Sequence, residues 1–277
     1  MLEIRDLTIK LIEDDRIILK DFDFTLNEGD KVGLIGEEGN GKSILLESIV
    51  NIDDVKNYCD VSGKIYLGNE IVGYLPQSLD EEYFDLTANE YLFSKVDVEP
   101  VDNNKLYKYL AEFNLSADIL SNDIKMRELS GGEKIKFILV VELLKNPTIF
   151  LFDEPSNDLD YESLSWLESF MKDLEIPYIF VSHDTNLLSN ISNRIIHLEQ
   201  VRRRSEAKHT VSNNTYDEYI RKRQNFIDSE TNRACKEREE FDKKIFRYRE
   251  STMQSSMTLE IQKMMWKVGC QRRKCIL

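Results

Sequence analysis

Two carboxylates follow directly on an apolar run, a place where charge is costly to bury. Residues 148–152, "TIFLF", lead straight into Asp153 and Glu154. An apolar run of this kind is typical of a strand buried on both faces of a parallel sheet. Buried carboxylates are stable only beside a cation or several hydrogen-bond donors. The pair therefore marks either a metal-assisted reaction site or an acidic strand end before the turn at Pro155.

A glycine-rich segment earlier in the chain favours the reaction site. Residues 36–43, "GEEGNGKS", match the phosphate-binding pattern G-x-x-x-x-G-K-[ST], after an apolar strand and before a helix. The glycines let successive backbone N–H groups face a polyphosphate at a helix N-terminus. Lys42 would neutralise phosphate charge, and the Ser43 hydroxyl would bind Mg²⁺. Such sites also need a carboxylate from a neighbouring strand to hold Mg²⁺, which is the function we expect of Asp153.

Three more motifs accompany these two. "LSGGE", residues 129–133, precedes the carboxylates by about twenty residues, and "YLPQ" ends at Gln77. "VSHD" places His183 at a strand end, 29 residues beyond Glu154. Each is weak alone, because "LSGGE" could be a simple helix N-terminus and a lone histidine is usually structural. All five together, in this order, form a highly specific signal.

The segments between the motifs alternate between strand and helix patterns. Three short strands are expected in residues 1–35, with a turn at "NEGD", and a helix after the phosphate-binding segment. Residues 87–145 are mostly helical in pattern, with a break at "VDVEPVDNN". Further strands are expected at 148–154, 177–184 and 192–200, with an amphipathic helix at 163–174. Strands that alternate with helices predict an α/β fold with a parallel sheet.

Charge is distributed unevenly along the 277 residues, whose net charge is −14. Residues 201–277 hold 19 Lys or Arg against 11 Asp or Glu, a net of +8. The first 200 residues hold 18 against 40, a net of −22. The acidic part is a poor surface for nucleic acid or anionic lipid, whereas the basic part could bind such a partner.

The basic part begins with a polar stretch and continues as a charged helix. After a turn at residues 212–214, we expect a long helix from about Arg221. Its apolar seam is thin and spaced as in a coiled coil, which suits a single partner helix. The seam consists of Ala234, Phe241, Ile245 and Tyr248. After about Glu250 the sequence fits this helix poorly.

Neither a targeting segment nor a structural metal site is expected. The start, "MLEIRDLTIKLIEDDR", is acidic and alternating, unlike a signal peptide. No apolar run approaches the ~20 residues that span a bilayer. The four cysteines, Cys59, Cys235, Cys270 and Cys275, lack metal-binding spacing and are expected to be free thiols in a reducing cytosol. We therefore expect a cytoplasmic protein with no transmembrane segment of its own.

The five motifs together resemble those of the ATP-binding-cassette (ABC) ATPases, over residues 1 to about 200. The resemblance implies an ABC-type P-loop ATPase core with an antiparallel β subdomain and a helical subdomain. In that family two cassettes close face to face, and each ATP lies between the P-loop of one and the "LSGGE" of the other. It implies ATP and Mg²⁺ as cofactors, ATP hydrolysis, and a second cassette as partner, either in a homodimer or on another chain.

The resemblance also assigns roles by position. Glu154 would be the general base, His183 would contact the γ-phosphate, and Gln77 would sense the metal and the attacking water. Mg²⁺ would be held by Ser43, Gln77 and Asp153. The implied nucleotide-contacting residues are Gly36, Glu37, Glu38, Gly39, Asn40, Gly41, Lys42, Ser43 and Ile44 on one cassette, with Ser130, Gly131, Gly132 and Glu133 on the other.

Two loops complete the expected site. In "SNDLD", residues 156–160, Asp158 or Asp160 would cross the interface between cassettes. Many cassettes stack an aromatic ring on adenine, but "IKLIEDDRIIL" has no aromatic residue. We therefore expect only apolar contact with the base, from Leu11 or Ile12.

A narrower resemblance is to the ABC-F subgroup. "DEPSNDLD" is similar to its "DEPTNxLD" form, and "VSNNTYDEYIRKRQ" to the passage that leads into its interdomain linker. ABC-F proteins lack transmembrane domains and bind the ribosome near the exit site, pushing the linker toward the peptidyl-tRNA. Some assist translation and others displace ribosome-targeting antibiotics, so antibiotic resistance is one implied role. The resemblance implies ribosome and tRNA contact through the basic C-terminal helix.

The resemblance divides the chain into a cassette (1–204), a connecting segment (205–225) and the start of a linker helix (226–277). ABC-F proteins usually carry two cassettes, whereas this sequence has one P-loop and one signature. We therefore expect a single-cassette or truncated form, with a frame-shifted reading as one hypothesis. Two other functions fit parts of the sequence: the ATP-binding subunit of a membrane transporter, and a remnant that binds ATP without hydrolysing it.

Overall fold

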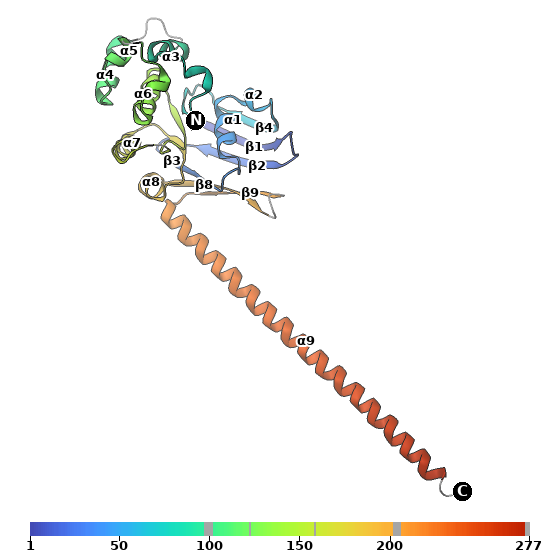
Figure 1. Cartoon of the computed structure of the whole chain (residues 1–277). Helices are drawn as coiled ribbons and strands as arrows, with labels where there is room; N and C mark the ends of the chain where they lie inside the picture. The colour runs from blue at the N-terminus through green and yellow to red at the C-terminus, as the bar shows by residue number, and fades with distance from the viewer. Residues whose placement is uncertain (97–101, 122, 158, 202–205, 275–277) are drawn as a thin grey trace. The chain divides into compact units, whose positions relative to one another are not determined.

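The computed structural model describes residues 1–96, 102–121, 123–157, 159–201 and 206–274 (Figure 1). Asp158, one of the two aspartates expected at an interface, lies outside these residues, as does the side chain of Tyr248. The chain divides into two units, Met1–Tyr219 and Ile220–Leu277.

The first unit contains every strand found in the described residues. They are β1 (Leu2–Leu11), β2 (Ile17–Leu26), β3 (Lys31–Ile35), β4 (Cys59–Tyr66), β5 (Val72–Leu75), β6 (Ile149–Asp153), β7 (Tyr178–Val181), β8 (Arg194–Val201) and β9 (Glu206–Ser212). Its helices are α1 (Lys42–Val50), α2 (Ile52–Val55), α3 (Ala88–Lys95), α4 (Asn103–Glu112), α5 (Asp118–Ser121), α6 (Gly131–Leu144), α7 (Tyr161–Asp173) and α8 (Thr185–Ile191), with 3₁₀ turns at Glu81–Tyr83 and Met126–Glu128.

The main sheet has six strands in the order β5-β6-β7-β3-β8-β9. The first five are parallel, as the sequence predicts, and β6 and β7 are buried along their whole length. Strand β9 is antiparallel to β8 and was not predicted, because its sequence "EAKHTVS" is mostly polar and neither of its faces is continuously apolar. As an edge strand it is held by pairing with β8, which polarity alone does not reveal.

A second, antiparallel sheet has the order β2-β1-β4, which confirms the expected antiparallel β subdomain. Helix α1 lies in the core that these two sheets share. Its Leu45, Leu46 and Ile49 are buried in one cluster with Ile9 of β1 and Leu34 of β3. The helix that follows the glycine-rich segment is therefore fixed from both sides.

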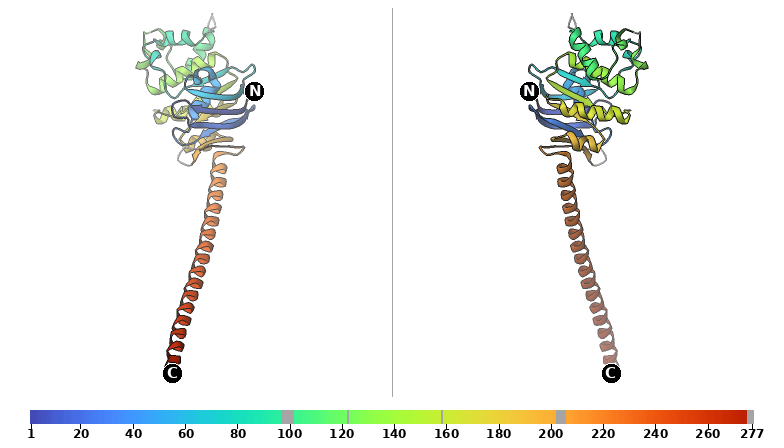
Figure 2. Two further views of the ribbon diagram at one scale, coloured as in Figure 1. Left: turned by 90° about the vertical axis from the view of Figure 1, so that its right-hand side faces the viewer. Right: turned by 90° about the vertical axis from the view of Figure 1, so that its left-hand side faces the viewer.

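The predicted helical region covers the other core. Helices α3 to α6 lie between residues 88 and 144, and Figure 2 shows them, in green, gathered at one end of the first unit. Phe137 of α6 packs in the same buried cluster as Phe150, Phe152 and Phe180 of the sheet. This packing anchors helix α6 to β6. The segment "LSGGE" lies at the N-terminal end of the same helix.

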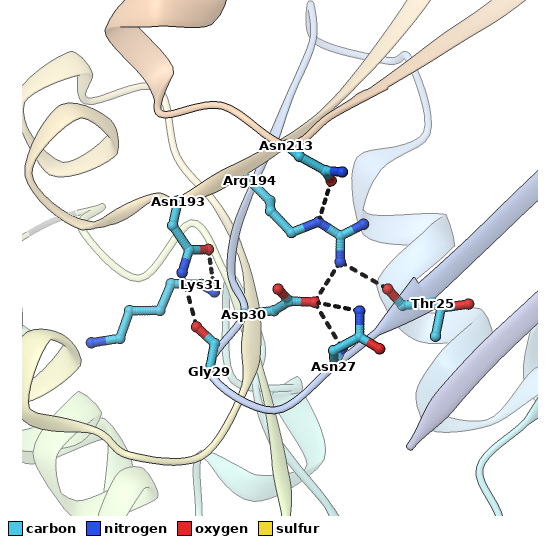
Figure 3. A network of polar contacts seen from close by, with 8 residues as sticks. All are labelled: Thr25, Asn27, Gly29, Asp30, Lys31, Asn193, Arg194 and Asn213. Atoms are coloured by element: carbon cyan, nitrogen blue, oxygen red, sulfur yellow. Dashed lines mark hydrogen bonds and ion pairs between the residues drawn. The ribbon is translucent and has the colours of Figure 1, made fainter.

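A polar network ties the two sheets together at the start of β3 (Figure 3). The Arg194 guanidinium bonds to Asp30 and to the Thr25 carbonyl (2.9 Å), and its Nε donates to Asn213 Oδ1 (2.9 Å). Asn193 Oδ1 accepts from the backbone N–H of Lys31 (2.8 Å). Since both members of the Arg194–Asp30 pair are about 15% exposed, removing one would leave a poorly hydrated charge. The network fixes the predicted "NEGD" turn and the start of the strand that carries the P-loop.

The second unit is formed by the long helix α9 (Tyr216–Lys274), whose first turn belongs to the first unit. The helix begins before the predicted Arg221, because Tyr219 is buried in the core of the first unit, with its hydroxyl 2.7 Å from His197 Nδ1. It also continues past Glu250, where we expected a poor fit. Residues 251–274 contain no proline and one glycine, so nothing in their backbone chemistry ends the helix.

Among the described residues, no helix combines the length and apolar character needed to cross a membrane.

Candidate active site

The glycine-rich segment forms a tight turn between β3 and α1. Gly36 has φ +154°, and a Cβ there would lie 2.4 Å from the Leu198 carbonyl oxygen of β8. Gly41 has φ +86°, and a Cβ there would lie 2.0 Å from Ile18 Cγ2 of β2. Only glycine fits these two positions without displacing backbone or core atoms. The turn is therefore held against β8 on one side and β2 on the other.

Two buried polar side chains complete this turn. Asn40 is 3% exposed, and its Nδ2 donates to the Leu198 carbonyl (3.0 Å). Lys42 is 6% exposed, and its Nζ donates to the carbonyls of Gly36 (2.9 Å) and Glu37 (3.1 Å). Burial lowers the pKa of Lys42, while the charge of Glu154 is the largest influence that raises it. A cation inside a loop at a helix N-terminus is a favourable arrangement for a polyphosphate.

Asp153 ends strand β6 and is 2% exposed. Among the described residues, its Oδ1 is buried without a hydrogen-bond partner. Burial raises the pKa of Asp153, a hydrogen bond from Ser43 lowers it, and the charges of Glu154 and Glu47 raise it further. A buried carboxylate oxygen without a donor, beside a serine hydroxyl, fits a hydrated Mg²⁺ well, since Mg²⁺ prefers oxygen ligands and keeps several waters.

The Glu154 carboxylate is where three of the motifs meet. Its Oε2 accepts from Asn157 Nδ2 (2.6 Å) and from Gln77 Nε2 (3.4 Å), and its Oε1 lies 3.4 Å from His183 Nε2. The backbone of Glu154 is left-handed (φ +48°), and its N–H donates to the Val181 carbonyl (3.1 Å). This unusual conformation aims the side chain away from Asp153 and toward the ends of the neighbouring strands.

Sequence reasoning gave no role to Asn157, although it makes the shortest of these contacts. It lies inside "SNDLD", three residues after Glu154, and its backbone N–H donates to the Glu154 carbonyl (3.1 Å). An asparagine at that position of a turn is the signal that could have found it, because its amide reaches back across the turn.

A cavity of about 470 Å³ adjoins these side chains. Ser43, Gln77 and Asp153 line it together, with Glu47 and Tyr74 among its other lining residues. The three predicted Mg²⁺ ligands therefore face a common space.

The "LSGGE" segment forms the N-terminus of α6. Ser130 is the N-cap: its Oγ accepts from the backbone N–H of Glu133 (3.3 Å), and its own N–H donates to Glu133 Oε2 (3.0 Å). The Ser130 hydroxyl also donates to Glu133 Oε2 (2.7 Å), and this hydrogen bond, together with the one from the Ser130 backbone N–H, lowers the pKa of Glu133. A Cβ at Gly132 would lie 2.4 Å from Ser163 Oγ in the first turn of α7, where Asp160 is the N-cap. Both helix ends therefore pack together.

The structure thus brings the predicted residues together in two groups. Lys42, Ser43, Gln77, Asp153, Glu154 and His183 belong to the first, and Ser130, Gly131, Gly132 and Glu133 to the second. Among the described residues, no hydrogen bond or ion pair joins the two. Of the other predicted nucleotide contacts, Glu37, Glu38 and Gly39 are exposed on the turn. Ile44, a residue of α1, is partly buried against the core.

Comparison with known proteins decides the family. Residues 19–157, half of the chain, match the family described as ABC transporter, and they include the P-loop, "LSGGE" and the Asp153–Glu154 pair. The chain belongs to this family of ATP-binding cassettes. Cassettes of the family are ATPases. The recognition based on five motifs is therefore confirmed, together with the ABC-type α/β fold.

Relatives extend the match beyond the family region. The cassette is 32% identical over 193 residues to ATP-binding protein Uup of Buchnera aphidicola subsp. Schizaphis graminum, which covers 67% of this chain and 31% of Uup. It is 30% identical over 227 residues to the energy-dependent translational throttle protein EttA of Escherichia coli K12, covering 69% and 40%. It is 33% identical over 184 residues to elongation factor 3 of Candida albicans, covering 66% and 17%.

These relatives are ABC-F proteins, which confirms the narrower resemblance found in "DEPSNDLD". The chain spans less than half of the length of each. Among solved structures, a dimeric ATP-binding cassette in a post-hydrolysis state with ADP and Pi matches with a TM-score of 0.59 and 23% identity. That match covers 76% of this chain and 98% of the other, and it shows the fold.

Proposed function

We propose that this cassette hydrolyses ATP to ADP and phosphate at a site shared with a second cassette, as an ABC-F-type protein that acts on the ribosome. One observation carries the hydrolytic part. The Glu154 carboxylate is held by Asn157, Gln77 and His183 at a strand end, directly after the buried Asp153, whose Oδ1 has no hydrogen-bond partner among the described residues.

Each side chain has a defined task in this proposal. ATP supplies a phosphoanhydride bond whose cleavage is limited by positioning and by negative charge on the phosphates. Lys42 and the N-terminus of α1 bind that charge. Asp153, Ser43 and Gln77 hold Mg²⁺. Glu154 accepts the proton of the attacking water, and His183 contacts the terminal phosphate.

The second cassette supplies what the P-loop half lacks. The N-terminus of α6, from Ser130 to Gly132, presents backbone N–H groups and a helix dipole to an anion bound elsewhere. The dimeric cassette among the similar structures supports this arrangement. Asp160 is our candidate for a residue that crosses to the partner, since it is the N-cap of α7, whose Ser163 lies beside Gly132.

The ribosomal part rests on other observations. Two relatives are named as a translational throttle protein and an elongation factor. The net charge of +8 after residue 200 favours RNA or tRNA phosphates as partners. The proposal assigns residues 1–204 to the cassette, 205–225 to a connection and 226–277 to the start of the linker helix. It locates the protein in the cytoplasm, as a translation factor or in ribosomal protection against antibiotics.

The test is co-sedimentation with ribosomes in ATP, using a Glu154→Gln variant that binds ATP but does not hydrolyse it. A matched control is Glu112→Gln, an exposed carboxylate paired with Lys108 on α4. We expect Glu154→Gln to pellet with ribosomes in ATP more than the control or the wild type does. Pelleting with membranes instead of ribosomes would contradict the ribosomal assignment and favour a transporter subunit. Pelleting with ribosomes to the same extent with and without ATP would contradict an ATP-dependent action on the ribosome.

A further inference from the structure

Glu47 places a further carboxylate beside the proposed Mg²⁺ ligands. It lies on α1 four residues after Ser43, and the two line the cavity of about 470 Å³ together with Asp153 and Gln77. Residues four apart on a helix are neighbours on one face, and helical side chains are inclined toward the N-terminus of their helix. The Glu47 side chain therefore leaves α1 on the side of Ser43 and is inclined toward the P-loop.

The electrostatics of Asp153 indicate the same proximity. Asp153 is 2% exposed, and among the described residues its Oδ1 has no hydrogen-bond partner. Burial raises the pKa of Asp153 most, and the charges of Glu154 and Glu47 raise it further. Negative charges gathered around a buried carboxylate repel one another, and a bound cation offsets this repulsion. The cavity beside Asp153 is therefore suited to a cation.

One oxygen of Glu47 is fixed by a neighbouring tyrosine. The Tyr58 hydroxyl, which also faces the cavity, donates to Glu47 Oε2. Burial raises the pKa of Tyr58 and this hydrogen bond raises it further, so the hydroxyl keeps its proton. A carboxylate has two acceptor oxygens. In the part of the chain that the structure describes, no hydrogen bond reaches Glu47 Oε1, which leaves this oxygen for a donor in the cavity.

The two lysines that line the cavity have partners other than Glu47. Lys145 Nζ pairs with Glu142 Oε1 (2.6 Å). Lys95 Nζ lies 3.9 Å from the centroid of the Tyr83 ring, which is a cation–π contact. Among the described residues, no ion pair involves Glu47. The charge of Glu47 is therefore open to a bound cation.

We propose that the Glu47 carboxylate, held by Tyr58, accepts hydrogen bonds from water molecules bound to Mg²⁺, an inference that rests on the proposed nucleotide site. Mg²⁺ keeps several of its waters when it binds a protein. Metal-bound water donates its hydrogens, so its partners must be acceptors, and an ionised carboxylate only accepts. Partners of this outer kind tune the affinity of a metal site. Glu47 is then a positioning residue for the metal that Ser43 and Asp153 hold.

The experiment measures the affinity of the full chain for a non-hydrolysable ATP analogue by calorimetry, without Mg²⁺ and over a series of Mg²⁺ concentrations. The readout is the Mg²⁺ requirement, the concentration that gives half of the gain in affinity. Glu47→Gln should raise this requirement about tenfold, the lower end for loss of an outer partner of a metal. Tyr58→Phe, which keeps the carboxylate but releases it, should raise the requirement about threefold, as for one neutral hydrogen bond. Binding without Mg²⁺ should be no weaker than in the wild type.

The matched control is Asp54→Asn, which removes a negative charge from the same cavity. Asp54 is exposed, and its carboxylate accepts from the Asn51 side chain (2.8 Å). We expect this variant to have the Mg²⁺ requirement of the wild type. If Asp54→Asn raises the requirement as much as Glu47→Gln does, the effect belongs to the general charge of the cavity, and the proposed contact is wrong.

Two further results would overturn the contact: an unchanged Mg²⁺ requirement in Glu47→Gln, or an equal loss of affinity without Mg²⁺, which would indicate damage to α1. An unchanged requirement in Tyr58→Phe would exclude Tyr58 as the residue that holds Glu47. Binding without Mg²⁺ also shows that each variant is folded. The underlying site is tested separately by Lys42→Ala, which should weaken binding of the analogue with and without Mg²⁺. If Lys42→Ala changes neither, the proposed nucleotide site itself is wrong, whatever Glu47 does.

Discussion

The two halves of the proposed site satisfy their polar groups in opposite ways. At the P-loop end, Glu154 takes two of its three partners from distant parts of the chain, with Gln77 from 77 residues before and His183 from 29 residues after, and the third, Asn157, from its own turn. Asp153 keeps a buried oxygen that has no hydrogen-bond partner in the part of the chain that the structure describes. At the signature end, Ser130 and Glu133 satisfy each other within four residues, as a helix cap.

This difference indicates which half depends on a ligand. Buried charges at Lys42 and Asp153 carry a desolvation penalty that phosphate and Mg²⁺ would offset. The signature segment is already capped by Ser130 and Glu133 as a stable helix end. Its remaining groups for a ligand are the backbone N–H groups and the helix dipole. In the proposed shared site, a second cassette brings its signature to the first P-loop.

The largest effect should come from the P-loop half. Glu154→Gln should slow ATP hydrolysis by about 10²-fold or more, the usual consequence of removing a general base, while ATP binding persists. The amide still fits beside Asn157 but cannot accept a proton from water. The measurement is steady-state phosphate release together with ATP affinity. Turnover equal to wild type would exclude Glu154 as the base and would contradict the account of the P-loop half.

The next effect concerns the buried cation. Lys42→Ala should weaken ATP binding by about tenfold or more, because hydrogen bonds to a charged partner contribute about 1.5–3 kcal/mol. The control is Lys56→Ala, an exposed lysine paired with Asp53. Calorimetric titration of both variants checks the prediction, with thermal unfolding to confirm the fold. Equal affinities in the two variants would mean that Lys42 does not face the phosphates.

The smallest effect should be at the signature cap. Ser130→Ala should lower the free energy of unfolding by about 1 kcal/mol, a typical value for an N-cap. The pKa of Glu133 is lowered in the folded chain, so its contribution is present above the ordinary carboxyl pKa and is lost as pH falls through the lowered value. Denaturant unfolding of the wild type and of the Ser130→Ala variant should therefore show a difference in the free energy of unfolding that becomes smaller in acid. If this difference in the free energy of unfolding is the same at every pH, the Glu133 carboxylate does not contribute to the helix cap.

The order of five motifs predicted roles for Lys42, Asp153 and Glu154, because a P-loop and a strand-end carboxylate follow fixed chemistry. These roles stay predictions, and the sequence did not predict the side chains that support the three residues. Asn157 was missed because its contact depends on the left-handed backbone of Glu154, which no local pattern announces.

The same limit applies to the fold. The apolar strands β3, β6 and β7 were predicted because burial on both faces leaves a plain apolar run. Strand β9 exists through its pairing with β8, and α9 begins early because Tyr219 is buried beside His197. Both depend on contacts between distant parts of the chain, which propensity and periodicity do not contain.

The most direct test of the shared site is complementation between two inactive variants. A Lys42→Ala chain keeps its signature, and a Ser130→Arg chain keeps its P-loop and should still bind ATP. Each alone should lack turnover, whereas a mixture should regain it in mixed pairs that contain one intact site. Random pairing would restore up to about a quarter of wild-type turnover per chain, and the gain should grow with total concentration, since pairing follows mass action. A mixture no more active than the average of its two components, or a Ser130→Arg chain that hydrolyses ATP like wild type, would contradict the shared site.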